Sequence, residues 1–473
     1  MTLSFPQDDR RHAVVIGGSM TGLVTARILL PYFERVTIVE RDALPVGPEL
    51  RRGVPQARHA HVLLVRGQHI LNDLFPGLTS ELATLGVPAV DWSADCVMVT
   101  AFGLGPRQPS DMITYTCSRP LLEWTVRQRL AALPQVQFLT GADVAGLEAT
   151  ANRSRVTGVQ LRFRQTPPPE LNGSVTLAAG LVVDASGRTS QLPAWLQALG
   201  FAAPQETIIN SFLGYASRWY QKPAGFAADW KCLLITPRPL SNPRSAVIYP
   251  IENDQWIVTL GGISRVFPPT DEAGVLDFAR NLSTPALYET IKDAEPLSSI
   301  FGYQRTENRW RHYERLTRWP LGLAVLGDAV CAFNPVYGQG MTTGALGALA
   351  LAQSLDRQQR RQADLTAVGE PFRHALARVN QTPWLMATGE DFRWPATEGG
   401  RPGARTRLLH RYLDQVLQIA SHDAVAQRAF MQVSHLMQPP ARLFTPTIIG
   451  RVLGHVARNG WRPVETAQSL QPT

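Results

Sequence analysis

Lysine, cysteine and long apolar runs are all scarce in this chain of 473 residues, in which only three of the 46 lysines and arginines are lysines. The four cysteines are far apart and form no C-x-x-C pair, so neither a disulfide framework nor a zinc site is indicated, and we expect buried thiols. No apolar run reaches the roughly 18 residues that span a bilayer. Charged residues at positions 8–11 precede the first apolar run, without the apolar core of a signal peptide. We therefore expect a globular cytoplasmic protein.

A basic groove interleaved with aromatic residues is also lacking. The net charge of +8 lies mostly in residues 351–473, which contain 15 arginines and nine acidic residues. Without such a groove or a known module, we expect no nucleic-acid partner. Residues 448–456 have apolar side chains at helical spacing, which favours a helix packed on its own domain. The open alternative is peripheral membrane contact through the C-terminal helices, which would make the protein membrane-associated.

A nucleotide-binding pattern opens the chain. Residues 17–22 read Gly-Gly-Ser-Met-Thr-Gly and lie between an apolar run typical of a strand and a helical apolar pattern. They match G-x-G-x-x-G at Gly17 and Gly22, while Ser19 replaces the middle glycine. Glu40 ends the next predicted strand, where a carboxylate can accept hydrogen bonds from an adenosine ribose. The pattern therefore indicates a site for FAD or NAD, whose ribose carries no 2′-phosphate.

Two later motifs favour FAD. Residues 326–329 (Leu-Gly-Asp-Ala) end a predicted strand, and residues 334–341 (Asn-Pro-Val-Tyr-Gly-Gln-Gly-Met) open a predicted helix. The positive end of that helix would stabilise the negative charge of a reduced flavin. Asp328 is placed to accept hydrogen bonds from ribityl or ribose hydroxyls. Residues 184–190 (Asp-Ala-Ser-Gly-Arg-Thr-Ser) supply a second acidic, glycine-containing turn after a strand.

With these motifs in this order, roughly the first 345 residues resemble the FAD monooxygenases of the p-hydroxybenzoate-hydroxylase type. Residues 51–61 and 118–124 are similar to the squalene-epoxidase-like branch and to bacterial polyether epoxidases. The resemblance implies that Arg58 lies near the flavin and that Arg119 contacts the FAD phosphate or ribityl chain. The sequence departs from the family at Ser19 and in the Asp-Ala-Ser-Gly turn, where many relatives have Asp-Gly, and the second departure leaves the handling of NAD(P)H open.

These patterns and the resemblance define the candidate site residues. The flavin-proximal candidates for catalysis are Arg58, His59 and His61, and none of them is assigned a catalytic role. His59 and His61 share one face of an extended segment and Arg58 the other, and no third ligand is spaced for a metal. The residues expected to bind the cofactor are Gly17, Ser19, Gly22, Glu40, Arg41, Arg58, Arg119, Asp184, Gly187, Gly327, Asp328, Pro335, Gly338, Gly340 and Met341.

The resulting fold class is α/β: a Rossmann-like FAD-binding domain of the GR2 type with an inserted antiparallel β-sheet substrate domain and a helical C-terminal region. The FAD-binding domain would comprise residues 1–60, 116–200 and 316–360, with 61–115 as a connecting substrate-domain segment, 201–315 as the β-sheet domain and 361–473 as the helical region. A hairpin is expected over residues 246–262. Aromatic residues between positions 215 and 230 would either line an apolar pocket or form core.

The resemblance also implies a reaction. NAD(P)H or a separate flavin reductase would reduce FAD, and O2 would form a C4a-hydroperoxyflavin that inserts one oxygen atom into a large apolar substrate. Because no base that would ionise a phenol is identified, alkene epoxidation in natural-product biosynthesis is favoured. The alternatives are an aromatic hydroxylase on the same scaffold, an FAD-dependent prenyl or alkene reductase, and a flavin-bound protein without turnover. A flavin halogenase is disfavoured, because no lysine precedes Lys222 and the W-x-W-x-I-P motif is absent.

Overall fold

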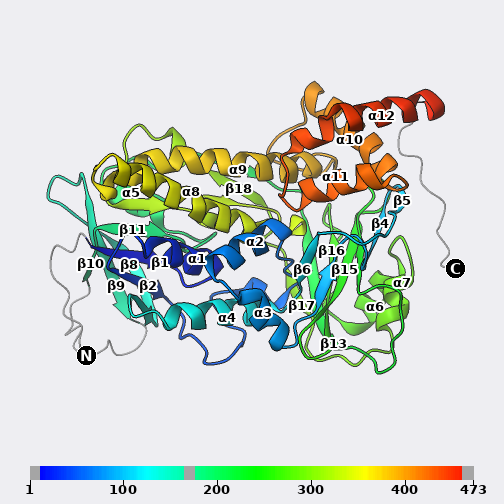
Figure 1. Ribbon diagram of the computed structural model, residues 1–473, viewed down its shortest axis with the longest axis horizontal. Coiled ribbons are helices and arrows are strands. Elements are labelled where there is room, and N and C mark those ends of the chain that lie inside the picture. The colour runs from blue at the N-terminus through cyan, green and yellow to red at the C-terminus, as the bar shows by residue number, and fades with distance from the viewer. Residues whose placement is uncertain (1–10, 164–175, 461–473) are drawn as a thin grey trace.

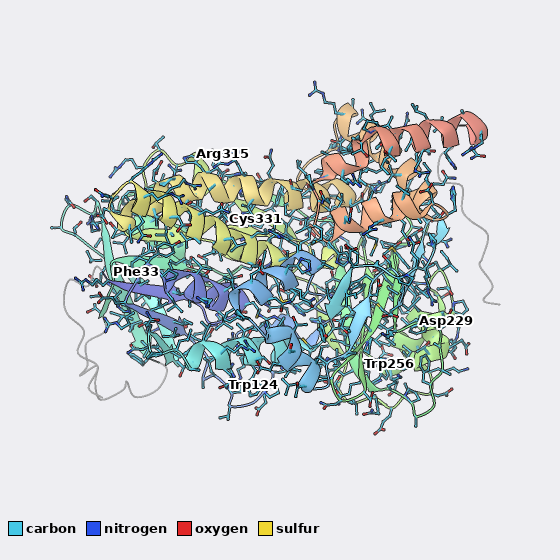
Figure 2. All side chains as sticks on the ribbon, viewed as in Figure 1. Phe33, Trp124, Asp229, Trp256, Arg315 and Cys331 are labelled. Atoms are coloured by element: carbon cyan, nitrogen blue, oxygen red, sulfur yellow. The ribbon has the colours of Figure 1, made fainter. Side chains whose placement is uncertain are left out.

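The computed structural model describes residues 11–163 and 176–460 (Figure 1). Two units lie side by side, and the last helices of the chain lie above the second unit. Each unit has its own core, as Figure 2 illustrates with Phe33 in the first unit and Trp256 in the second. The expected α/β class is therefore confirmed.

The first unit is built on a five-stranded parallel sheet. Its strands follow each other in the order β19, β11, β1, β2 and β7. The strands of its centre are buried along nearly their whole length, which explains their continuous apolar sequences. The strands are β1 (His12–Ile16), β2 (Arg35–Glu40), β7 (Val136–Thr140), β11 (Leu181–Asp184) and β19 (Leu323–Val325).

Helices and a small sheet complete this unit. Helix α1 packs on β1, α2, α4 and α8, which confirms the N-terminal βαβ arrangement. A three-stranded antiparallel sheet, which the sequence patterns did not reveal, packs through β9 on β11 and through β8 on β2. The helices are α1 (Met20–Leu29), α2 (Val65–Leu74), α4 (Arg119–Ala131) and α8 (Gly340–Arg360), and the added strands are β8 (Ala142–Ala149), β9 (Val156–Phe163) and β10 (Thr176–Ala178).

The second unit is a seven-stranded sheet in the order β17, β13, β16, β15, β14, β4 and β5. The predicted hairpin is present, and its turn places Asn253 and Asp254 at positive φ. One pair, β4 with β14, is parallel and sets Cys96 opposite Cys232. The elements are β4 (Cys96–Thr100), β5 (Gly103–Leu104), β13 (Gly214–Gln221), β14 (Cys232–Ile235), β15 (Arg244–Ile251), β16 (Gln255–Gly262) and β17 (Phe301–Tyr303), with α6 (Glu272–Arg280) and α7 (Ala286–Ile291) on one face.

The C-terminal helices serve two different roles. Helix α9 (Gly369–Asp391) runs along α8 in the first unit, whereas α10 (Ala404–Ala420), α11 (Ala424–Ser434) and α12 (Pro446–Asn459) share a core of their own. None of the described helices is both long and apolar enough to cross a bilayer. All four cysteines are buried free thiols, as expected.

Short elements complete these units. They are β3 (Ala89–Asp91), β6 (Ile113–Tyr115), β12 (Glu206–Ile209), β18 (Asn308–Arg311), β20 (Cys331–Ala332), α3 (Leu78–Thr84) and α5 (Leu192–Ala198). Among them, β18 pairs with both β12 and β20, and the buried residues Ile209, Trp310 and Cys331 of these strands belong to the core of the first unit.

Candidate active site

A cavity of about 2580 Å³ lies between the carboxyl ends of the parallel strands, the seven-stranded sheet and the C-terminal helices. Sites for one small molecule usually occupy roughly 300–1,000 Å³. The cavity therefore has room for a cofactor and a second ligand. Its position beyond the carboxyl ends of β1, β2 and β19 is where open α/β sheets bind their ligands.

The glycine turn after β1 depends on the lack of side chains. Gly17 has a φ of +105°, and a Cβ there would lie 2.7 Å from the carbonyl oxygen of Ala185. A Cβ on Gly22 would lie 1.8 Å from the carbonyl oxygen of Gly17. Both glycines are thus required for the turn, whose Gly17 and Ser19 line the cavity.

Five buried charges surround this turn. Arg51 donates to Glu123 at 2.7 Å and lies 3.1 Å from Asp42 and 3.2 Å from Glu40, while Arg119 lies 2.8 Å from Glu123. We call these five residues the charge network. Burial alone would raise the pKa of Glu123, but the charges of Arg119 and Arg51 hold it below its usual range. The network gives the turn a fixed polar wall.

Ser19 gains a role from this network. Its hydroxyl accepts a hydrogen bond from Arg119 at 2.8 Å and donates to Glu123 at 3.3 Å. Glu40 accepts from the backbone N–H of Gly18 at 2.8 Å, which fixes the strand end against the turn. The sequence patterns and resemblance selected Ser19, Glu40 and Arg119 but missed Arg51, Asp42 and Glu123. Arg51 and Glu123 lie within the two epoxidase-like stretches, so the resemblance could have pointed to both of them.

The third motif faces the same cavity. Asp328 lines it, and within residues 11–163 and 176–460 its carboxylate makes no hydrogen bond. Burial raises the pKa of Asp328, against the opposing charges of Arg188 and Arg311. The segment from Pro335 to Met341 lines the cavity and leads into the first turn of α8. An open acceptor beside a positive helix end fits a cofactor that carries both hydroxyl groups and negative charge.

The remaining cofactor candidates divide into two groups. Arg41, Gly187, Gly338 and Gly340 also line the cavity. Gly327 does not line the cavity. It is needed for the turn that presents Asp328, because its φ is +65° and a side chain there would clash with Thr21.

Asp184 is not brought to the cavity. It is fully buried, and it accepts hydrogen bonds from the backbone N–H of Ser186 and the hydroxyl of Ser190. The structure therefore places Asp184 inside its own turn, where it holds the segment that carries Gly187.

His59 and His61 line the cavity, whereas Arg58 does not. The guanidinium of Arg58 instead lies over the ring of Phe301, 4.7 Å from its centroid. His59 Nδ1 forms a hydrogen bond with Ser217 Oγ at 2.8 Å, and His61 Nδ1 with the carbonyl of His59 at 2.9 Å. The two imidazoles thus share a side of the segment, as predicted, and Arg58 points elsewhere.

Both imidazoles are neutral near pH 7. Burial, with the charge of Arg58, lowers the pKa of His59 to about 4. Burial, with the charge of Arg119, lowers the pKa of His61 to about 4. Since the Nδ1–H of neutral His61 donates to a carbonyl, its Nε2 is a bare acceptor and a weak base.

The other end of the cavity is mainly apolar. Among the aromatic residues between positions 215 and 230, Tyr215 lines the cavity, while Tyr220, Phe226 and Trp230 belong to the core under α6 and α7. The apolar wall comes from the second unit and from α9 to η7 (Pro440–Phe444). It consists of Trp92, Met98, Phe102, Leu234, Leu385, Met386, Leu409, Leu413, Leu417, Phe430, Met431, Leu443 and Phe444. We call this part the apolar end.

One buried carboxylate behind the cavity wall was missed. Asp391, the last residue of α9, accepts hydrogen bonds from Asn308 at 2.6 Å, from Asn334 at 3.0 Å and from the hydroxyl of Tyr337 at 3.3 Å. Burial raises the pKa of Asp391 to about 6, although these donors oppose the rise. Asp391 therefore holds the segment that leads into α8, and no local motif marks it.

The chain is similar to known proteins in sequence and in fold. Residues 10–368 match a family model described as FAD binding domain. Protein Rv3254 of Mycobacterium tuberculosis is 32% identical over 453 residues, covering 94% of each chain. Among solved structures, PqsL of Pseudomonas aeruginosa, described as a probable FAD-dependent monooxygenase, is 18% identical, with a TM-score of 0.59 over 81% of this chain and 97% of its own. The myxobacterial chondrochloren halogenase CndH is 17% identical, with a TM-score of 0.60 over 96% and 98%. These two structures show the shared fold.

Proposed function

This chain belongs to the FAD-binding-domain family that includes flavin-dependent monooxygenases and halogenases, and on that premise we propose that it inserts one oxygen atom from O2 into a large apolar substrate. The observation that carries the proposal is a continuous cavity of about 2580 Å³, which joins a polar end suited to FAD with an apolar end and has room for both a cofactor and a second ligand. We propose alkene epoxidation in natural-product biosynthesis as the specific reaction.

The polar end has the groups that FAD requires. Asp328 would accept from ribityl or ribose hydroxyls, and the start of α8 would face the part of the flavin that becomes negative on reduction. The turn of Gly17 and Ser19 would lie beside the pyrophosphate, with the positive charge of Arg119 held against the hydroxyl of Ser19. When bound, FAD supplies the electrons that activate O2 and allow one oxygen atom to be transferred.

The apolar end supports an uncharged substrate. Its leucine, methionine and phenylalanine side chains would bury the substrate and keep water from the reacting centre. Four titratable side chains that line the cavity are neutral at pH 7: burial lowers the pKa of His59 and His61 and raises the pKa of Tyr215 and Tyr337. A histidine with a pKa of about 4 is a poor base for ionising a phenol. This favours an alkene over a phenol.

Two related reactions are less well supported. A flavin halogenase of the known type needs a lysine near the flavin, and no lysine lines the cavity in the part of the chain that the structure describes. An alkene reductase would use the same polar end but does not require O2. We also propose that NAD(P)H or a separate flavin reductase supplies the electrons that reduce FAD.

The test is turnover of the FAD-loaded protein under labelled oxygen gas with a polyene and a phenol of similar size. Incorporation of one labelled atom into the polyene, with little hydrogen peroxide released, is the expected result. Coupling to the phenol alone would replace epoxidation with hydroxylation. Addition of two hydrogens without label would identify a reductase, and an unchanged substrate with all electrons lost to peroxide would contradict both proposals.

A further inference from the structure

Helix α12 leaves an apolar face without a partner among the described residues. Its inner face buries Ile448 and Val452 against α10 and α11. Beside this inner face Ile449 and Leu453 are 37% and 61% exposed, one turn apart, and Ala457 continues the stripe. A helix on the surface of a globular protein normally turns polar residues outward. In Figure 1, α12 lies at the outer edge of the molecule.

Further exposed apolar residues lie at an opening of the cavity. Leu385, Leu409 and Phe444 line the cavity and are also 62%, 41% and 41% exposed, so they stand where it meets solvent. Leu408, beside Leu409, is 63% exposed. Phe444 stacks on Tyr412 of α10 at 4.7 Å, which joins the opening to the element that precedes α12. We call the six exposed residues the outer apolar surface: Leu385, Leu408, Leu409, Phe444, Ile449 and Leu453.

The same part of the chain is strongly basic. Residues 401–459 contain eight arginines and two acidic residues. Both acids are already paired, Asp414 with Arg393 and Asp423 with Arg451, each at 2.7 Å. Six exposed arginines have no carboxylate partner within the described ranges: Arg401, Arg405, Arg407, Arg411, Arg442 and Arg458. Their field would attract a surface of negative charge.

We propose that α10, η7 and α12 dock on an anionic lipid bilayer, with the opening of the cavity facing the lipid. Apolar side chains flanked by arginines on exposed helices are the pattern of interfacial helices, and anionic lipids attract such basic segments. The bilayer then supplies the apolar substrate directly to the cavity. The docking stands on the surface alone, whereas the delivery of substrate rests on the proposed function.

Docking is tested by sedimenting the full-length, FAD-loaded protein with phosphatidylcholine vesicles, with and without phosphatidylglycerol. Binding to the anionic vesicles, weakened by added salt, is expected. Leu453→Asp should lower the vesicle affinity by about tenfold or more. The variant loses the leucine side chain that would be buried in the lipid, and it adds a negative charge that the anionic lipid repels. The matched control is Leu297→Asp, at a leucine that is 41% exposed in the second unit and should bind as the wild type does.

Wild-type protein that stays in solution with anionic vesicles would overturn the proposal. Equal affinity of Leu453→Asp and wild type for the vesicles would also overturn it. The same holds if both proteins bind a soluble acidic protein and show equal affinity for the vesicles. Delivery is tested separately, by offering one polyene in vesicles and the same polyene in detergent micelles. Leu453→Asp should lose turnover only with vesicles. Absence of oxygen incorporation in both presentations would contradict the proposed reaction and leave the docking result unaffected.

Discussion

The two ends of the cavity are built on different physical principles. The polar end is defined by the charge network, in which five buried groups contact one another at 2.7 to 3.2 Å around a turn that only glycine permits. The apolar end is defined by the bulk of side chains from several helices and strands. A cofactor needs fixed donors and acceptors, whereas a substrate end can change by altering side-chain size.

The comparison predicts unequal tolerance to substitution. Removing one member of a buried charge cluster leaves other charges without partners, which is costly. Apolar contacts are non-directional, so a smaller side chain loses only its own contribution. Substitutions at the polar end should therefore affect folding and cofactor affinity, and those at the apolar end should affect the substrate alone.

The largest effect is expected at Glu123. Glu123→Ala leaves Arg51 and Arg119 buried without their shared acceptor, and should lower the free energy of unfolding by about 3–5 kcal/mol. Urea denaturation measures it. The control is Glu81→Ala, which breaks the more exposed pair with Arg129 and should cost less than about 1 kcal/mol. Equal losses in the two variants would show that the charge network does not stabilise the polar end.

Asp391 should make stability depend on pH. Its folded-state pKa of about 6 lies above its ordinary value, so the folded protein binds the proton more tightly than the unfolded chain. This contribution is fully present below about pH 4 and is lost as pH rises through 6, by about 3 kcal/mol in total. Asp391→Asn should remove that fall from the pH profile of the free energy of unfolding. Parallel profiles for wild type and variant between pH 4 and 7 would refute this.

Asp328→Ala should weaken FAD binding without a comparable loss of stability. The substitution leaves a cofactor hydroxyl without its acceptor, at a cost of about 1–3 kcal/mol, or roughly five- to 150-fold in affinity. Titration of apoprotein with FAD measures the change. Asp277→Ala on the exposed side of α6 serves as the control. Unchanged FAD affinity in folded Asp328→Ala would remove this residue from the cofactor site.

The smallest effect is expected at the apolar end. Leu417→Val removes one methylene from the wall, worth about 0.8 kcal/mol, and should lower kcat/KM for an apolar substrate by about fourfold. FAD affinity should not change. A loss of FAD affinity as large as that of Asp328→Ala would show that the two ends are not independent.

Local backbone geometry was predictable from the sequence, and long-range pairing was not. The glycine spacing identified the turn at Gly17 because its steric demands involve a few consecutive residues. The ion pair between Arg51 and Glu123 joins residues 72 positions apart, and Asp391 reaches back 57 positions to Asn334. No local motif predicts either of these long-range pairs. Asp184 shows the converse, since its motif position suggested a ligand but its carboxylate serves the turn itself.

The three-stranded sheet was missed for a related reason. Strand β8 has a register shift between Val144 and Gly146, which interrupts the alternation that marks a strand. The pairing of β4 with β14 was also hidden, because its two strands lie on either side of a long segment of the first unit. Even so, the apolar runs that precede the three motifs were expected to be strands, and they form β1, β11 and β19.

The order of the parallel strands also determines when the protein can fold during its synthesis. Strand β1 lies between β2 and β11, and β11 in turn pairs with β19, which begins at Leu323. The ribosome must therefore complete the whole second unit before the last parallel strand is available, and such long-range pairing slows folding. Until then β11 offers an open edge of Leu181, Val182 and Val183. The nascent chain should depend on chaperones during this interval, because an apolar strand edge readily pairs with other chains.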